Sequence, residues 1–329
     1  MLTRALCVAT AVAALFLSDQ ATSSGMGERM RLAIPGNSRS ACEGARAPLS
    51  ETLSYTLRWG AFPGSGRADV AVHVPPGFDA TRRPGLVLYF HGWQSCVEAA
   101  LSTTDVPCAD EGSPRPGGGL IAQVDASRVN AILVAVEVRP DAPTGEPGQM
   151  AMPGGAHGLL RELFSEKLAA PLGCTLDPDG LDRIVVVAHS GGYQAAAGVV
   201  EGGDLPRITE VDLLDALYGG QNIFARWIAE DAMRFDARIM SPLRFVDLYT
   251  CCGGTLGSSR SMVGRVSDIL GPVGLVRSVR DDDGDSELDG EDLTAPVVFK
   301  RVRRAHADLP KAYLRALLEA AGFAQISPR

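Results

Sequence analysis

The sequence predicts an α/β protein whose mostly parallel sheet is covered by helices on both faces. From about residue 51 onward, short apolar runs alternate with segments of helical periodicity, and this alternation is typical of parallel sheets. The chain begins this pattern with two alternating segments separated by turn residues 63–66, which predicts an antiparallel hairpin. We therefore expect an eight-stranded sheet in one domain over residues 51–329, preceded by a loosely structured segment over residues 24–50.

The expected strands are short runs rich in β-branched and aliphatic residues. In chain order they cover residues 52–61, 68–74, 86–90, 130–138, 184–188, 208–214, 243–249 and 296–302. The expected helices carry apolar residues three or four positions apart. They cover residues 157–170, 191–201, 223–233, 258–270 and 309–321. Two long connections, 97–119 and 139–156, are rich in Pro and Gly, and loops of this length usually form the rim of a binding site.

The first 23 residues have the features of an export signal. Arg4 precedes an apolar stretch over residues 5–17, and Ala21 and Ser23 are the small residues of a cleavage site after Ser23. A helix of that length spans about 20 Å, whereas a bilayer core needs about 30 Å. We therefore expect a cleaved signal peptide, no membrane span, and a secreted or periplasmic protein.

The cysteines that follow the signal predict disulfides, because their number is even and the chain is expected to be exported. They are Cys42, Cys96, Cys108, Cys174, Cys251 and Cys252. Cys96 and Cys108 are the expected pair, since they are close in sequence. The adjacent Cys251 and Cys252 are expected to bond distant partners, and buried free thiols are the alternative.

Composition and charge argue against several classes of partner. The formal net charge is −8, whereas a nucleic-acid-binding surface needs a positive field. No GxxxxGK[ST] or GxGxxG motif follows an expected strand, so no nucleotide cofactor is expected. No Cys/His cluster has the spacing of a zinc site. Hydrophobic residues make up 46% of the chain and charged residues 21%, which excludes disorder over most of its length.

The segment that carries chemistry is the strand over residues 184–188 and the helix that follows it. Ala188, Ser190 and Gly192 form the pattern small-x-Ser-x-Gly of a nucleophile elbow. The turn holds the serine in a strained backbone conformation, so the residues two before and two after it must be small. In such a turn the Gly191 N–H, at the helix N-terminus, is able to bind an oxyanion.

On this motif the chain resembles the α/β-hydrolase superfamily over about residues 51–325, although Ala188 stands where glycine is commoner. The resemblance implies the α/β-hydrolase fold and the chain order nucleophile, acid, histidine. Of the five histidines only His306 follows Ser190, so His306 is the expected base. Asp215, at the end of the strand over 208–214, is the expected acid.

Asp247 is the alternative acid, but it lies inside the strand over 243–249 and is less free to reach the histidine. The segment His91-Gly92-Trp93 resembles the His-Gly turn of lipases and esterases. It implies the Trp93 N–H as the second oxyanion donor and a structural hydrogen-bonding role for His91. The residues expected to line the substrate site are Gln94, His189 and Tyr218.

The acidic run over residues 281–292 invites comparison with a calcium site. Counted from Asp285, Gly290 is placed as in an EF-hand, but the twelfth position holds Pro296 where the motif needs Glu. We expect a solvated acidic loop at the end of the sheet away from Ser190, with calcium binding as the alternative.

These observations predict an exported serine hydrolase that cleaves a small-molecule or polymeric ester through an acyl-enzyme, with no cofactor. Trp93 and Tyr218 beside the site indicate an extended or apolar acyl partner. An amidase or peptidase of the same fold is the nearest alternative. A non-catalytic binding protein on this scaffold and a calcium-dependent surface protein are the alternatives from other classes.

Overall fold

The computed structural model describes residues 42, 51–108, 113–139, 145–236, 243–272, 279–284 and 286–326. The predicted signal peptide over residues 1–23 and, apart from Cys42, the predicted leader over residues 24–50 lie outside the described residues.

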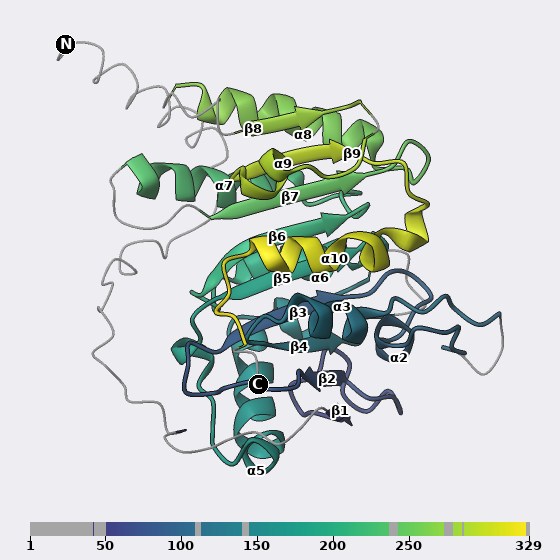
Figure 1. Ribbon diagram of the computed structural model, residues 1–329, viewed down its shortest axis with the longest axis vertical. Helices are drawn as coiled ribbons and strands as arrows, with labels where there is room; N and C mark the ends of the chain where they lie inside the picture. Colours follow the sequence, from purple (N-terminus) through teal and green to yellow (C-terminus); the bar gives the residue numbers. More distant parts are fainter. Residues whose placement is uncertain are drawn as a thin grey trace.

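A nine-stranded sheet forms the centre of the protein, in the order β1-β2-β4-β3-β5-β6-β7-β9-β8 (Figure 1). The strands are β1 (Glu51–Tyr55), β2 (Val70–Val74), β3 (Gly85–Phe90), β4 (Ala131–Val136), β5 (Ile184–His189), β6 (Ile208–Leu214), β7 (Arg244–Tyr249), β8 (Val279–Asp282) and β9 (Val297–Arg301). Among these strands only β2 runs against the others: it pairs antiparallel with β1 and β4, and every other pairing is parallel. The predicted α/β-hydrolase fold, with its leading antiparallel hairpin and mostly parallel sheet, is confirmed.

Two details of the predicted sheet are wrong. There are nine strands and not eight, because the short edge strand β8 reads Val-Arg-Asp-Asp and has no apolar run to reveal it. The first strand ends at Tyr55, whereas it was expected to extend over residues 52–61.

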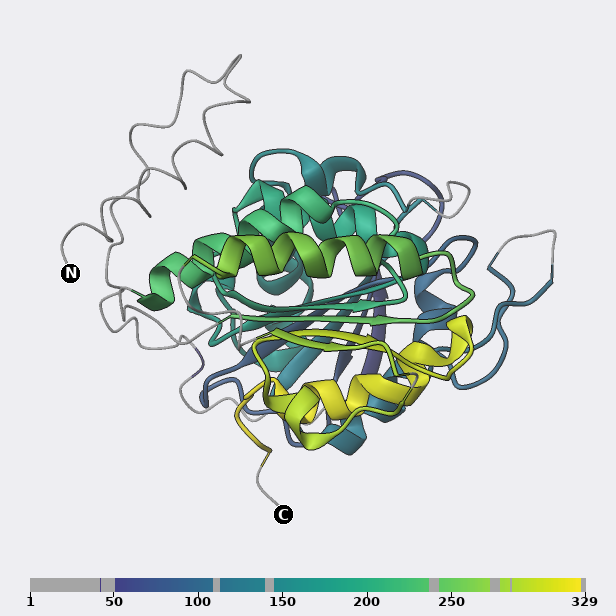
Figure 2. The same cartoon turned by 90° about the horizontal axis from the view of Figure 1, so that it is seen from above.

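Helices cover both faces of the sheet, as predicted. The helices are α2 (Val97–Leu101), α3 (Leu120–Ser127), α4 (Gly155–Glu162), α5 (Ala169–Leu172), α6 (Tyr193–Gly202), α7 (Gln221–Asp236), α8 (Leu256–Leu270), α9 (Gly290–Thr294) and α10 (Leu309–Ala320). One apolar core lies between the sheet and α4, α6, α7 and α8, and a second lies between the sheet and α2, α3 and α10. Figure 2 shows α8 and α10 on opposite sides of the sheet.

The alternation of side chains along β5 explains why the strand is apolar throughout. Ile184, Val186 and Ala188 belong to the first core, and Val185 and Val187 to the second. Since side chains alternate between the two faces of a strand, a strand covered on both faces can be apolar at successive positions, as β5 is from Ile184 to Ala188. The expected helix over 157–170 is divided into α4, a π-helical turn (Leu163–Lys167) and α5.

The described residues contain three disulfides. They join Cys42 to Cys174, Cys96 to Cys108, and Cys251 to Cys252. The predicted pair Cys96–Cys108 is confirmed. The expectation of distant partners for Cys251 and Cys252 is wrong: the other four cysteines pair among themselves, and these two bond each other on the exposed turn after β7. None of the helices in the described part of the chain is long and apolar enough to cross a membrane.

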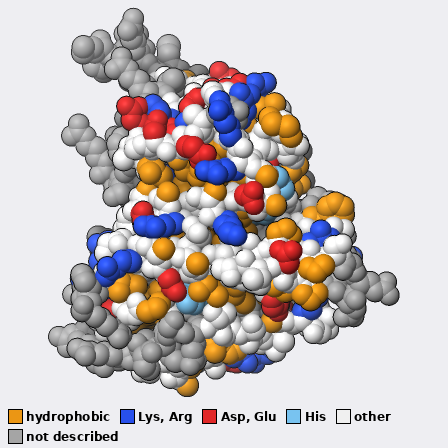
Figure 3. Space-filling view, turned by 45° about the vertical axis from the view of Figure 1, so that its right-hand side comes forward, with side chains coloured by type: hydrophobic (Ala, Val, Ile, Leu, Met, Phe, Trp, Pro, Cys, Tyr) orange, Lys and Arg blue, Asp and Glu red, His pale blue; other side chains and the backbone are white. Residues whose placement is uncertain are grey.

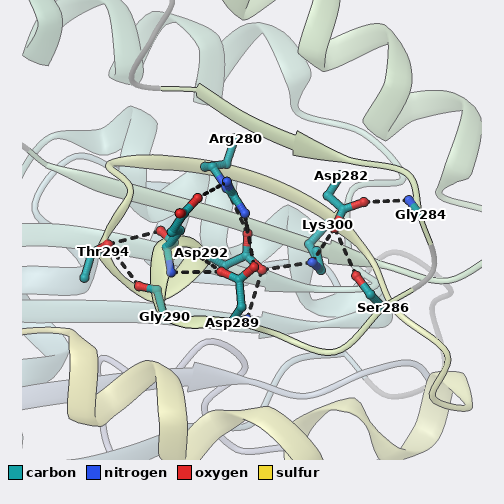
Figure 4. A network of polar contacts seen from close by, with 10 residues as sticks. Arg280, Asp282, Gly284, Ser286, Asp289, Gly290, Asp292, Thr294 and Lys300 are labelled. Carbon is teal, nitrogen blue, oxygen red and sulfur yellow. Dashed lines mark hydrogen bonds and ion pairs between the residues drawn. The ribbon is translucent and has the colours of Figure 1, made fainter.

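The acidic run was expected at the wrong end of the sheet. Because β8 is parallel to β9, Asp282 lies at the carboxyl edge of the sheet, which is also the edge at which β5 ends at Ser190. Most carboxylates of the acidic run over residues 281–292 are paired with Lys or Arg side chains, several of which Figure 4 shows. The buried Lys300 ammonium contacts Asp282 and lies 2.9 Å from Asp292 Oδ2, and the Arg280 guanidinium lies 3.2 Å from Asp292 Oδ1. On the face drawn in Figure 3, acidic and basic side chains are likewise interspersed.

Candidate active site

Ser190 stands in a strained turn directly after β5. Its φ is +53°, a value that L-residues other than glycine adopt rarely. The turn is possible because its neighbours are small: a Cβ on Gly192 would lie 2.5 Å from the Phe90 carbonyl oxygen and 2.8 Å from that of His91. The requirement for a small residue two positions after the serine, inferred from the sequence motif, thus has a steric cause in the neighbouring strand β3.

The structure brings His306 and Asp215 together from two other strand ends. Asp215 follows β6 and is fully buried, whereas His306 follows β9 and has a side chain that is 33% exposed. His306 Nδ1 lies 2.7 Å from Asp215 Oδ2. Since a carboxylate only accepts hydrogen bonds, Nδ1–H is the donor, and Nε2 is left as the basic nitrogen of the ring.

The Asp215 carboxylate is held by two threonines in addition to the histidine. Thr250 Oγ1–H donates to Oδ2 at 2.7 Å, the Thr250 N–H donates to Oδ1 at 3.3 Å, and the Thr255 hydroxyl also donates to Oδ1. Burial raises the pKa of Asp215, but the hydrogen bonds from His306, Thr255 and Thr250 together bring it below its ordinary value. The site therefore holds an ionised carboxylate in a buried position.

Asp247, the alternative acid, is equally buried but lacks such donors. Neither of its carboxylate oxygens has a hydrogen-bond partner among the described residues. Burial raises its pKa to about 7, and the negative charge of Asp215 contributes in the same direction. No contact of Asp247 with His306 is found within the described ranges, so the structure brings only Asp215 to the histidine.

His189 connects the turn at Ser190 to His306. Its Nε2–H donates to the His306 carbonyl oxygen at 3.0 Å, and the two ring centroids are 4.8 Å apart. Burial and the nearby charge of His306 lower the pKa of His189 to about 4, so its ring is neutral at pH 7. The residue directly before Ser190 therefore anchors the backbone of His306, and the substrate-lining role expected for it stays a prediction.

The loop after β3 lies against the nucleophile. A Cβ on Gly92 would come within 2.9 Å of Ser190 Cβ and 3.4 Å of Ser190 Oγ, so only glycine fits there. His91 is buried and fixes this loop, because its Nδ1–H donates to the Gly92 carbonyl at 2.9 Å and its Nε2 accepts from the Val138 N–H at 3.2 Å. The structural role expected for His91 agrees with these contacts.

Trp93, Gln94 and Tyr218 were also predicted as parts of the site. Trp93 follows Gly92 and is 50% exposed. Gln94 has a φ of +58°, and its side-chain oxygen accepts from Arg115 on the neighbouring rim loop. The Tyr218 hydroxyl donates to the Gly253 carbonyl. Burial and the charge of Asp215 raise the pKa of Tyr218.

Sequence reasoning missed Thr250, Thr255 and Gly253 as parts of this site. A Cβ on Gly253 would lie 1.8 Å from Asp215 Oδ2, so the turn after β7 packs directly on the carboxylate. The sequence offered one signal for these residues, namely that Thr250 immediately follows the buried strand β7 at the carboxyl edge of the sheet. In the described ranges, no group of three or more His, Cys, Asp or Glu side chains is arranged to hold a metal ion.

Comparison with known proteins gives distant structural similarities only. Neither a family model nor a curated protein sequence matches the chain. A mutant feruloyl esterase module from Clostridium thermocellum is 11% identical with a TM-score of 0.48, the match covering 88% of this chain and 94% of that one. A ferulic acid esterase from Anaeromyces mucronatus is 15% identical with a TM-score of 0.41, covering 87% and 94%. The BES protein from Bacillus cereus is 11% identical with a TM-score of 0.44, covering 84% and 96%.

Proposed function

We propose that this protein is an exported serine hydrolase that cleaves carboxylic esters. The observation that carries the proposal is one constellation. Ser190 stands in a strained turn covered by a glycine loop, and the residue before it, His189, has its ring 4.8 Å from the ring of His306. His306 Nδ1 in turn lies 2.7 Å from the buried, ionised Asp215. The proposed nucleophile Ser190, acid Asp215 and base His306 follow each other along the chain in the order of an α/β-hydrolase triad.

In the proposed mechanism His306 Nε2 takes the proton from Ser190 as its oxygen attacks the acyl carbon. Asp215 holds the Nδ1–H tautomer and stabilises the imidazolium. The backbone N–H groups of Gly191 and Trp93 bind the oxyanion, each contributing about 3 kcal/mol to the transition state. His306 then protonates the departing alcohol, and water attacks the acyl-enzyme by the same route in reverse.

Esters are the proposed substrates because an alcohol leaves a tetrahedral intermediate more readily than an amine does. The exposed Trp93 and Tyr218 supply apolar surface at the rim for the acyl or alcohol part of a small or polymeric substrate. Export is supported by the apolar N-terminal segment of the sequence and by three disulfides, which persist in oxidising compartments.

The test is covalent labelling with a fluorophosphonate probe, comparing the wild type with Ser190→Ala and His306→Ala. We expect one label per wild-type molecule and none on either variant, all three being checked for native near-UV circular dichroism. A folded wild type that does not react contradicts the proposal and favours a binding protein on this scaffold. A panel of matched esters and amides then follows, and faster amide cleavage identifies an amidase instead.

A further inference from the structure

The turn between β7 and α8 contains a disulfide between adjacent residues. Cys251 and Cys252 bond each other, and both residues are exposed. A bond between neighbouring cysteines closes a small ring around one peptide unit, so it constrains the backbone of the turn itself. The other two disulfides are different in kind, because they join cysteines 132 and 12 positions apart in the sequence and their cysteines are buried.

The residues on either side of this disulfide hold the Asp215 carboxylate. Thr250, directly before it, donates to Oδ2 at 2.7 Å through its hydroxyl, and the Gly253 N–H, directly after it, donates to that hydroxyl at 2.9 Å. Thr255 donates to Oδ1. The two threonine donors thus lie on opposite sides of the Cys251–Cys252 ring, and their spacing depends on the path of the backbone through it.

The same turn also contacts Tyr218, a residue expected to line the substrate site. The Gly253 carbonyl accepts from the Tyr218 hydroxyl, and Gly254, at a φ of +94°, packs on the Tyr218 ring, where a Cβ would lie 3.1 Å from Cε1. One short turn therefore contacts both the Asp215 carboxylate and the Tyr218 side chain.

We propose that the Cys251–Cys252 disulfide is a positioning element of the catalytic site. Oxidised, it fixes the turn that orients Asp215 toward His306 and holds the Tyr218 hydroxyl. A thiol reductant converts it to two thiols by donating two electrons and two protons and forming its own disulfide, and the freed turn then holds Asp215 less well. This inference rests on the proposed function, since its effect is on the turnover of that site.

The experiment reduces the folded protein with a mild thiol and follows ester hydrolysis. Exposure predicts that Cys251 and Cys252 are reduced first, which alkylation and mass spectrometry verify. We expect kcat to fall about tenfold, the effect of weakening a charged hydrogen bond at Asp215, with KM changed less than twofold. Removing the reductant and reoxidising restores the rate.

Two double variants separate this turn from the other disulfides. Cys251→Ser/Cys252→Ser is expected to have the kcat of the reduced enzyme and no further response to thiol. Cys96→Ser/Cys108→Ser retains the Cys251–Cys252 disulfide. We therefore expect reduction to lower kcat in this variant by the same factor as in the wild type. If the Cys251→Ser/Cys252→Ser variant does not fold, the reversible reduction of the wild type decides alone.

A third variant tests whether the disulfide acts through the donors to Asp215. Thr255→Val lacks one donor already, so reduction is expected to lower its kcat by a smaller factor than in the wild type, a coupling that general loosening of the fold does not produce.

The inference is overturned if the protein, purified without reductant, carries free thiols at Cys251 and Cys252. It is also overturned if complete reduction of this pair leaves kcat unchanged, or if the Thr255→Val variant loses the same factor as the wild type. An oxidised wild type that neither binds the fluorophosphonate nor hydrolyses esters contradicts the proposed function instead.

Discussion

Asp215→Asn paired with Asp247→Asn tests which buried carboxylate serves the histidine. Asp215 accepts the His306 Nδ1–H at 2.7 Å as an ionised group, so the amide removes the charge that stabilises the imidazolium and weakens control of the tautomer. A loss of about 10³- to 10⁴-fold in kcat/KM is expected, equivalent to about 4–5.5 kcal/mol of transition-state stabilisation. Asp247→Asn changes a carboxyl group that has no contact with His306 and accepts no hydrogen bond in the described ranges, although the Ser259 hydroxyl lies near enough to oppose the rise of its pKa. Its kcat/KM is expected to stay within about threefold of wild type, the scatter of an ordinary neutral substitution.

Asp247→Asn has its own signature in stability. With a pKa of about 7 when folded and 3.8 as the ordinary value, the unfolded chain loses this proton before the folded one does. The carboxyl group therefore makes the protein less stable as pH rises from about 4 to about 7, by up to about 4 kcal/mol, and the penalty is constant above that range. In Asp247→Asn this part of the pH dependence should be absent.

The assay is initial-rate hydrolysis of a p-nitrophenyl ester at pH 8, with urea unfolding of each variant at pH 5 and pH 8. The reasoning is refuted if Asp247→Asn loses more activity than Asp215→Asn, or if Asp215→Asn keeps more than a tenth of the wild-type kcat/KM while remaining folded.

Three further predictions concern stability. Lys300→Met leaves the fully buried Asp292 without its ammonium partner, so urea unfolding should show a loss of about 3 kcal/mol, partly regained in Lys300→Met/Asp292→Asn; equal stability of the single variant and wild type would contradict this. Serine at both Cys42 and Cys174, which are 132 residues apart, should cost up to about 5 kcal/mol by the loop-entropy relation, and a loss below 1 kcal/mol would show that the bridge constrains little. Burial lowers the pKa of His189 to about 4, so stability should fall by up to about 3 kcal/mol as pH drops from about 6.5 to 4, and His189→Gln, unprotonated throughout, should flatten that slope in acid urea titrations.

The sequence allowed most of the sheet to be located because its strands are buried on both faces. A continuous apolar run such as that of β5 indicates such a strand without reference to the rest of the chain. The edge strand β8 carries charged residues on a half-exposed surface, so no apolar pattern marks it. The short helices α2 and α9 are only five residues long, too short for helical periodicity to be visible.

The residues of the candidate site also differ in how visible they are in the sequence. Ser190 is marked by a local steric requirement, and His306 by its order in the chain, so both could be predicted. The donors to Asp215 are not local: Thr250 and Thr255 act from the turn after β7, and that turn adjoins Asp215 only because β6 and β7 pair in parallel. The bond between Cys251 and Cys252 was missed for a similar reason, since its partners became evident only when the other cysteines were paired.

Donors, and not burial, distinguish the two buried aspartates near the proposed site. Asp215 and Asp247 are both fully buried near the carboxyl edge, and desolvation acts on both in the same direction. Their pKa values nevertheless move in opposite directions, because only Asp215 accepts hydrogen bonds from a histidine and two threonines. A carboxylate that stays ionised out of water must be surrounded by donors before the histidine is protonated, and the β7–α8 turn supplies them. The residues of that turn are therefore as much a condition for the proposed chemistry as the serine is.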